Sequence, residues 1–258
     1  VRELTEEGML ANLLAWDALS AMLRDDLRRA SRSSLQAEAL APDDPAIRFT
    51  VGVVEVGADL VDKGLSTMES AASQVGDAES WLTLGVTAMQ ARQPFKAHRF
   101  LKEAARVGPK QAKPHVALAQ LVLERLDLTP RTKQPELLLE IEGHIQAAEE
   151  RDPQAEGIPV IKAQLAVLSG QPEAADALLR GAVIERPKDQ VAWSNLAQFL
   201  TLQGRHREAL EALEEAVAEG VPGVELQRML ADSLVNEGQL DDAAEVLERV
   251  LVQDPRDQ

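Results

Sequence analysis

The chain has 258 residues, of which 45% are hydrophobic but only 3% aromatic, and its formal net charge at pH 7 is -16. This acidity disfavours binding to nucleic acid and to an anionic membrane surface, because both would repel a chain of the same charge sign. The chain has no cysteine, which excludes disulfides, zinc–thiolate sites, iron–sulfur clusters and thiol catalysis. Alanine and leucine dominate, a composition that suits closely packed helices and not β-sheets.

Residues 1–43 are predicted to form a pair of helices, with Trp16 packed inside the pair and Pro42 closing it. No apolar run approaches the ~20 residues that span a bilayer, and VRELTEEG at the N-terminus is not a signal peptide. We therefore expect no insertion into a membrane and a cytoplasmic location. Because the chain does not begin with methionine, we also expect it to be a piece of a longer one. A periplasmic location is the alternative if a signal or anchor has been removed.

Small residues recur every 34 positions through the second half of the chain. The repeated sets are Ala163, Ala197 and Ala231; Gly170, Gly204 and Gly238; and Ala175, Ala209 and Ala243. Each unit holds two amphipathic segments with apolar residues at helical spacing, and its glycine is suited to end the first helix in a left-handed conformation. A fixed period of this length predicts a solenoid of stacked helical pairs.

This spacing predicts six units: 44–77, 78–111, 112–155, 156–189, 190–223 and 224–258. The third unit is about ten residues longer than the others and carries an inserted loop at about residues 126–135, bracketed by Pro130 and Pro135. Long loops in repeat arrays often line a binding face. A tolerated surface insertion is the alternative to a contact with a partner. The basic residues that would make such a contact are Arg125, Arg131 and Lys133.

The repeated motifs resemble those of the tetratricopeptide repeat (TPR) family. WLTLG at residues 81–85 and WSNLA at 193–197 match the signature of its first helix, and the alanine of the second helix and the closing proline match as well. The resemblance covers residues 44–258 well and 1–43 loosely. It implies an all-α fold, an α-solenoid of about six to seven helix–turn–helix units forming a right-handed superhelix. The first helix of each unit would line the concave face.

The resemblance also implies which positions face the groove, where relatives hold a peptide or a helix. In this chain these positions include a row of glutamines and an apolar patch, and they extend to Leu202 and Val235 in the last two units. Amide side chains can pair with both donors and acceptors of an extended backbone, and apolar side chains can receive a hydrophobic anchor. The candidate groove residues are Val116, Gln120, Leu123, Val160, Ile161, Gln164, Val167, Leu168, Asn195 and Gln198.

Nothing in the sequence indicates catalysis or a bound cofactor or metal. None of the four histidines belongs to an HExxH pair, and the glycines are spread along the chain instead of forming a phosphate-binding loop. The acidic pairs fall at predicted helix ends and turns, where capping explains those in first turns. We therefore expect no enzyme, no cofactor and no metal site.

The last predicted helix presents an apolar side without a capping helix. Solenoid ends normally need a polar cap, so this side is a candidate surface for self-association, unless further units follow in a longer chain. Its apolar residues are Val246, Leu247, Val250 and Leu251.

Together these features predict a non-catalytic scaffold for protein–protein interaction, which binds a peptide or helix of a partner protein in the concave groove. Two alternatives stay open from the sequence. One is a module for oligomerisation or spacing, and the other is a regulatory domain of a larger multidomain protein.

Overall fold

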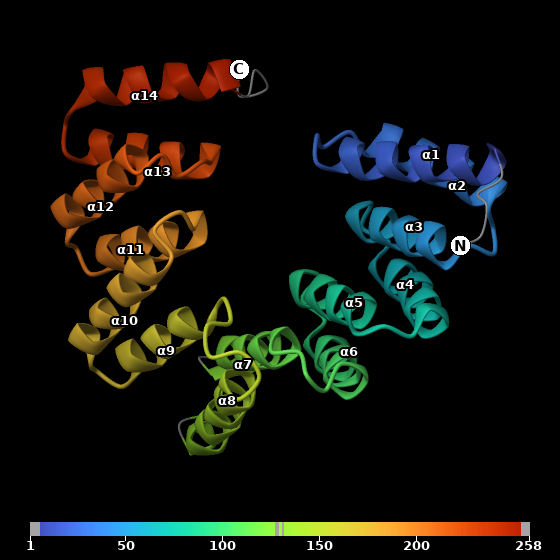
Figure 1. The fold of residues 1–258 in the computed structure, drawn as a ribbon, viewed down its shortest axis with the longest axis horizontal. Helices are drawn as coiled ribbons and strands as arrows, with labels where there is room; N and C mark the ends of the chain where they lie inside the picture. Colours follow the sequence, from blue (N-terminus) through green and yellow to red (C-terminus); the bar gives the residue numbers. More distant parts are fainter. Residues whose placement is uncertain (1–5, 127–128, 131, 254–258) are drawn as a thin grey trace. The chain divides into compact units, whose positions relative to one another are not determined.

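The computed structural model describes residues 6–126, 129–130 and 132–253, and these residues form helices and no strands (Figure 1). The fold is an all-α solenoid in which the helices come in consecutive antiparallel pairs. The fourteen helices of the described residues are α1 (Glu6–Met22), α2 (Leu27–Leu40), α3 (Pro45–Gly57), α4 (Val61–Val75), α5 (Ala78–Gln90), α6 (Pro94–Val107), α7 (Lys113–Leu126), α8 (Gln134–Glu149), α9 (Ile158–Leu168), α10 (Pro172–Glu185), α11 (Gln190–Leu202), α12 (His206–Ala218), α13 (Val224–Asn236) and α14 (Leu240–Gln253).

The helices divide into two compact units, Val1–Glu156 with α1 to α8 and Gly157–Gln258 with α9 to α14. Within each unit the second helix of a pair contacts its own first helix and the first helix of the next pair. In the second unit, for example, α10 contacts both α9 and α11, and α12 contacts both α11 and α13. In the second unit this stacking gives one core that runs from α9 to α14, which no single helical pair could bury. In the first unit the buried residues form separate clusters along the stack.

Local sequence signals explain where the helices begin and turn. Asp189 caps α11, because its carboxylate accepts hydrogen bonds from the backbone N–H groups of Val191 and Ala192 at 2.9 and 3.4 Å. The turns after α9, α11 and α13 contain glycines in the left-handed region, with φ between 71° and 77°. These glycines are the ones that the 34-residue spacing singled out, namely Gly170, Gly204 and Gly238.

Two tryptophans of the repeated motif lie in the cores of the two units. Trp81 in α5 is 8% exposed and packs against Phe100 of α6 with ring centroids 6.2 Å apart. Trp193 in α11 is 3% exposed, and its indole N–H donates a hydrogen bond to the carbonyl of Pro187 at 2.9 Å. Both rings therefore serve the packing of a helical pair.

The expectation that Trp16 packs inside the first helical pair is wrong. Trp16 is 75% exposed. The buried side of α1 consists entirely of alanines, which let α2 and α3 approach closely, and Trp16 lies on the opposite side of the helix. We call the exposed large apolar residues of that side, together with Leu23 in the turn after the helix, the α1 stripe: Met9, Leu13, Trp16 and Leu23.

Candidate functional site

The first helices of the second unit expose a set of apolar and amide side chains. Val167 and Leu168 at the end of α9 are 37% and 51% exposed, and Leu202 at the end of α11 is 77% exposed. Val235 near the end of α13 is 49% exposed. The 34-residue spacing places Val167 and Val235 at one repeat position and Leu168 and Leu202 at the next, and α11 contacts α13 directly. We call this set, with the two exposed glutamines beside it, the first-helix face: Gln164, Val167, Leu168, Gln198, Leu202 and Val235.

Two of the predicted groove residues are instead part of the core. Ile161 is 1% exposed and Leu123 is 7% exposed. Both side chains are buried, so neither can contact a ligand without a change of the fold. Val160 and Asn195 are half-buried, and Val160 packs against the core of the second unit.

Val116 and Gln120 lie on α7 and belong to the first unit. Both are half-buried, and the amide of Gln120 donates to the carboxylate of Glu124 at 3.5 Å. Gln164 and Gln198 lie in the second unit and are exposed. The predicted row of three glutamines is therefore divided between the two units.

The predicted inserted loop is shorter than the sequence suggested, because α8 begins at Gln134 and Pro135 lies in its first turn. The amide of Gln134 donates to the carbonyl of Thr129 at 3.2 Å and ties the loop to the start of α8. Of the basic residues predicted here, Lys133 is exposed and Arg125, in the last turn of α7, is half-buried. Arg131 lies outside the described residues.

The predicted apolar side of α14 is largely covered. Val246 is 5% exposed and Val250 is 1% exposed, because α14 packs against α13 with these residues. Leu247 is 42% exposed and Leu251 is half-buried. The prediction that all four residues form an open interface is therefore wrong for Val246 and Val250.

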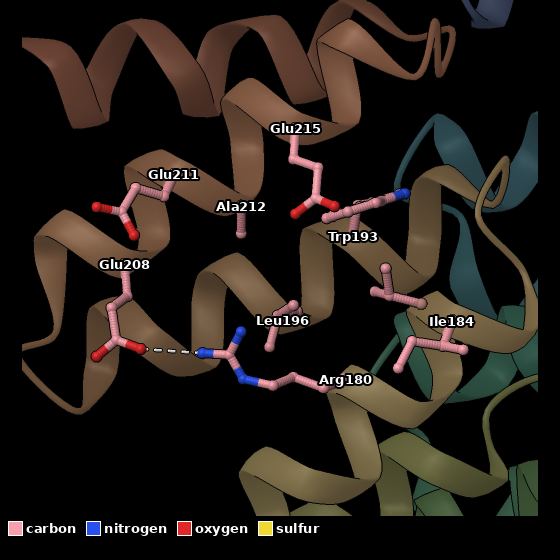
Figure 2. Close-up of a pocket in the computed structure, with 9 residues that line it drawn as sticks. Arg180, Ile184, Trp193, Leu196, Glu208, Glu211, Ala212 and Glu215 are labelled. Atoms are coloured by element: carbon pink, nitrogen blue, oxygen red, sulfur yellow. Dashed lines mark hydrogen bonds and ion pairs between the residues drawn. The ribbon is translucent and has the colours of Figure 1, made fainter.

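A cavity of about 300 Å³ opens between the second helices α10 and α12, with α11 beneath it (Figure 2). Val183, Trp193, Leu196 and Ala212 give it an apolar lining. Three carboxylates stand along one side of α12, and Arg180 and the 78% exposed Ile184 extend from α10. We call this cavity the α10–α12 pocket; its carboxylates are those of Glu208, Glu211 and Glu215.

An ion-pair network neutralises one end of this pocket. Arg205 contacts Glu208 at 2.6 Å and Asp176 at 3.4 Å, while Arg180 contacts Glu208 at 3.0 Å and Asp176 at 3.1 Å. The hydrogen bond from Arg205 holds the pKa of Glu208 below its ordinary value. Glu208 is therefore held in its charged form by two arginines. Of the other two carboxylates, Glu211 has one exposed ion pair, with Arg207 at 3.6 Å.

Three histidines that the sequence analysis treated separately come together in the first unit. His98 of α6 lies 3.8 Å from the carboxylate of Glu140 in α8, and the rings of His115 in α7 and His144 in α8 are 5.8 Å apart. Burial lowers the pKa of each of the three imidazoles. No three metal-binding side chains of the described residues are arranged to hold an ion. Sequence spacing gave no signal for this cluster, because its members come from three different helices.

A family model of the tetratricopeptide repeat matches residues 166–222 and 200–258. Residues 166–258 therefore carry tetratricopeptide repeats. Comparison with curated protein sequences gives no match. TPR proteins generally act as non-catalytic interaction scaffolds, and their fold suggests protein partners.

Solved structures share the fold across nearly the whole chain. A tetratricopeptide repeat protein from Parabacteroides merdae matches with a TM-score of 0.59 at 14% identity, over 96% of this chain and 94% of that one. Yeast Tom70 matches with a TM-score of 0.74 at 15% identity, over 96% of this chain but only 51% of Tom70. Human IFIT1, solved as a dimer with PPP-AAAA, matches with a TM-score of 0.58 at 17% identity, over 93% of this chain and 64% of IFIT1. At these identities the likeness shows the fold alone.

In the part of the chain that the structure describes, none of the helices has the length and apolar character needed to cross a bilayer.

Proposed function

We propose that this TPR protein is a non-catalytic scaffold that binds a peptide or helix of a partner protein on the first-helix face of its second unit. The observation that supports this most strongly is the recurrence of exposed apolar residues at the ends of α9, α11 and α13. Large apolar side chains that lie exposed near the ends of successive first helices form a surface that water solvates poorly and a partner can cover.

The chemistry of this face suits an amphipathic partner. Full burial of an exposed leucine side chain contributes roughly 1.5–3 kcal/mol. Leu168 and Leu202, at 51% and 77% exposed, would contribute about half and about three quarters of that. Gln164 and Gln198 stand at equivalent positions beside them, and each amide can donate and accept hydrogen bonds. A partner segment with apolar residues flanked by exposed backbone or polar groups would satisfy both kinds of side chain.

The test compares aspartate substitutions at exposed apolar residues on this face with the same substitution at an exposed leucine elsewhere. The double variant Val167→Asp/Leu202→Asp places charge at two of the exposed apolar positions, and Leu139→Asp places the same charge at a 68% exposed leucine of α8. We expect a partner captured from a cell lysate by the unaltered protein and by Leu139→Asp to be lost with the double variant. Equal capture by all three proteins would contradict binding on this face.

The α1 stripe favours a second candidate function, self-association through α1 with a second copy of the chain. Within α1, Met9, Leu13, Trp16 and Ser20 follow the alternating four- and three-residue spacing of a helix-pairing seam. Leu23 follows at the next such interval, in the turn after the helix. Light scattering on the unaltered protein should then show a dimer that Trp16→Glu dissociates. A monomer at all accessible concentrations would contradict this function. It would not bear on the proposal that the first-helix face binds a partner.

A further inference from the structure

We propose that the α10–α12 pocket is a second binding site, distinct from the first-helix face, which receives a lysine side chain of a partner protein. The pocket shares no residue with the first-helix face. It is lined by the second helices α10 and α12, with the core residues Trp193 and Leu196 of α11 beneath them (Figure 2).

The size of the pocket limits its occupant. A volume of about 300 Å³ lies at the lower end of the range seen for small-molecule sites, which is about 300–1,000 Å³. It accommodates one long side chain more readily than a nucleotide or a larger cofactor. The apolar lining of Trp193, Leu196 and Ala212 suits the methylene stem of such a side chain, which lysine commonly buries while its charged end stays near water.

The charges select a cation. Glu211 and Glu215 stand one turn apart on α12, a spacing that places their Cβ atoms about 5–6 Å from each other. The partner of Glu211 is Arg207 at 3.6 Å, an exposed pair of little strength. Among the described residues, no cation forms an ion pair with Glu215. Two carboxylates at the mouth of an apolar cavity, in a chain of net charge -16, are complementary to a single positive charge.

The arrangement favours lysine over arginine. A guanidinium group pairs best side-on with one carboxylate, whereas an ammonium group is a compact charge with three donors that can point in different directions. Glu211 and Glu215 approach the pocket mouth from successive turns of α12 and do not present one planar acceptor pair. Exposed Ile184 on the opposite wall adds apolar contact for a residue next to the lysine.

The test uses the tryptophan in the pocket as its reporter. The chain has three tryptophans, so an NMR spectrum of the full chain contains three indole N–H signals, and Trp193→Phe assigns the one from the pocket. The probes are two capped peptides, Ala-Leu-Lys-Leu-Ala and Ala-Leu-Gln-Leu-Ala. We expect the lysine peptide to shift the Trp193 signal saturably, and the glutamine peptide to leave it unchanged.

Matched variants decide whether the two carboxylates are responsible. Glu211→Gln/Glu215→Gln removes them, and Glu214→Gln makes the same change on the same helix at an exposed residue outside the pocket. We expect binding of the lysine peptide to weaken about tenfold in the double variant, as for the loss of two partly exposed ion pairs, and to stay unchanged in Glu214→Gln. Unchanged indole signals without peptide confirm that each variant is folded.

Other outcomes overturn the proposal. No shift of the Trp193 signal would exclude the pocket as a lysine site. An equal shift with the glutamine peptide would show that charge is not recognised. Equal weakening by Glu214→Gln, or an equal shift of the exposed Trp16 signal, would show general attraction to an acidic surface. None of these results bears on the first-helix face, which is tested by its own variants.

Discussion

Replacing Gly64 with alanine should separate α3 from α4 at the point where these helices cross. A methyl group on Gly64 would lie 2.6 Å from the carbonyl oxygen of Gly52 and 2.7 Å from the backbone nitrogen of Val56. Backbone atoms cannot rotate away as a flexible side chain would, so the two helices must move apart. Overpacking of this kind costs about 1–3 kcal/mol of stability, and contacts with two backbone atoms place this variant at the upper end.

A second glycine provides the control. Gly143 lies in α8 of the same unit, is exposed, and a methyl group there would meet nothing within 4 Å. Alanine within a helix is more stabilising than glycine by up to about 1 kcal/mol. This stabilisation applies equally to Gly64→Ala and Gly143→Ala. The difference in unfolding free energy between the two variants therefore isolates the overpacking, at about 1–3 kcal/mol.

Urea unfolding followed by circular dichroism measures this difference. Both glycines belong to the first unit, so both variants report on the same cooperative structure. We expect Gly143→Ala to raise the midpoint of this transition and Gly64→Ala to lower it. Equal stabilisation by both variants would refute the argument that α3 and α4 cross by contact of their backbones.

Three further predictions follow from burial, capping and titration. Leu200→Ala should lower the free energy of unfolding by about 2–5 kcal/mol, because Leu200 is 0% exposed. Leu202→Ala on the same helix should change it by less than about 0.5 kcal/mol. Equal effects of the two variants in urea unfolding would contradict the assigned burial. Asp189→Ala should cost about 1 kcal/mol through loss of the cap of α11, and Asp189→Asn should restore most of it; an unchanged unfolding midpoint in the alanine variant would argue against the cap. Burial lowers the pKa of His115 and His144 in the folded protein below the ordinary value of 6.5. Between the folded-state pKa and 6.5, the unfolded chain therefore binds more protons than the folded protein. The stability they confer is complete above pH 6.5 and is lost as the pH falls from 6.5 through the folded pKa. Thermal unfolding between pH 7.5 and 5.5 should show this loss, and His144→Gln should reduce it; an identical slope in the variant would contradict the assignment.

The sequence predicts the helical solenoid well because the signals for it are local and repeated. Gly170, Gly204 and Gly238 stand at the same position of three successive units, and each adopts the left-handed conformation that ends a first helix. Trp81 and Trp193 likewise lie in the cores of their pairs. Such features depend on residues within one helical pair, so their spacing along the chain carries the information.

The sequence predicts less well which side of each helix stays exposed, because that depends on contacts with other helices that the repeat spacing does not specify. Trp16 was expected in the core, but the alanines of α1 offer closer packing and leave the ring outside. Ile161 and Leu123 were assigned to the groove by their repeat position alone, and both are buried. Val250 was expected to be open, and α13 covers it.

Site-specific crosslinking tests the central claim most directly. A photoreactive amino acid is placed at Leu168 or Leu202 on the first-helix face, or at Leu139 of α8, whose exposure lies between theirs, and the protein is irradiated in lysate. The account predicts that the same partner protein is crosslinked from Leu168 and from Leu202 and not from Leu139. Crosslinking of that partner from Leu139 alone, or the absence of any partner at Leu168 and Leu202, would contradict it.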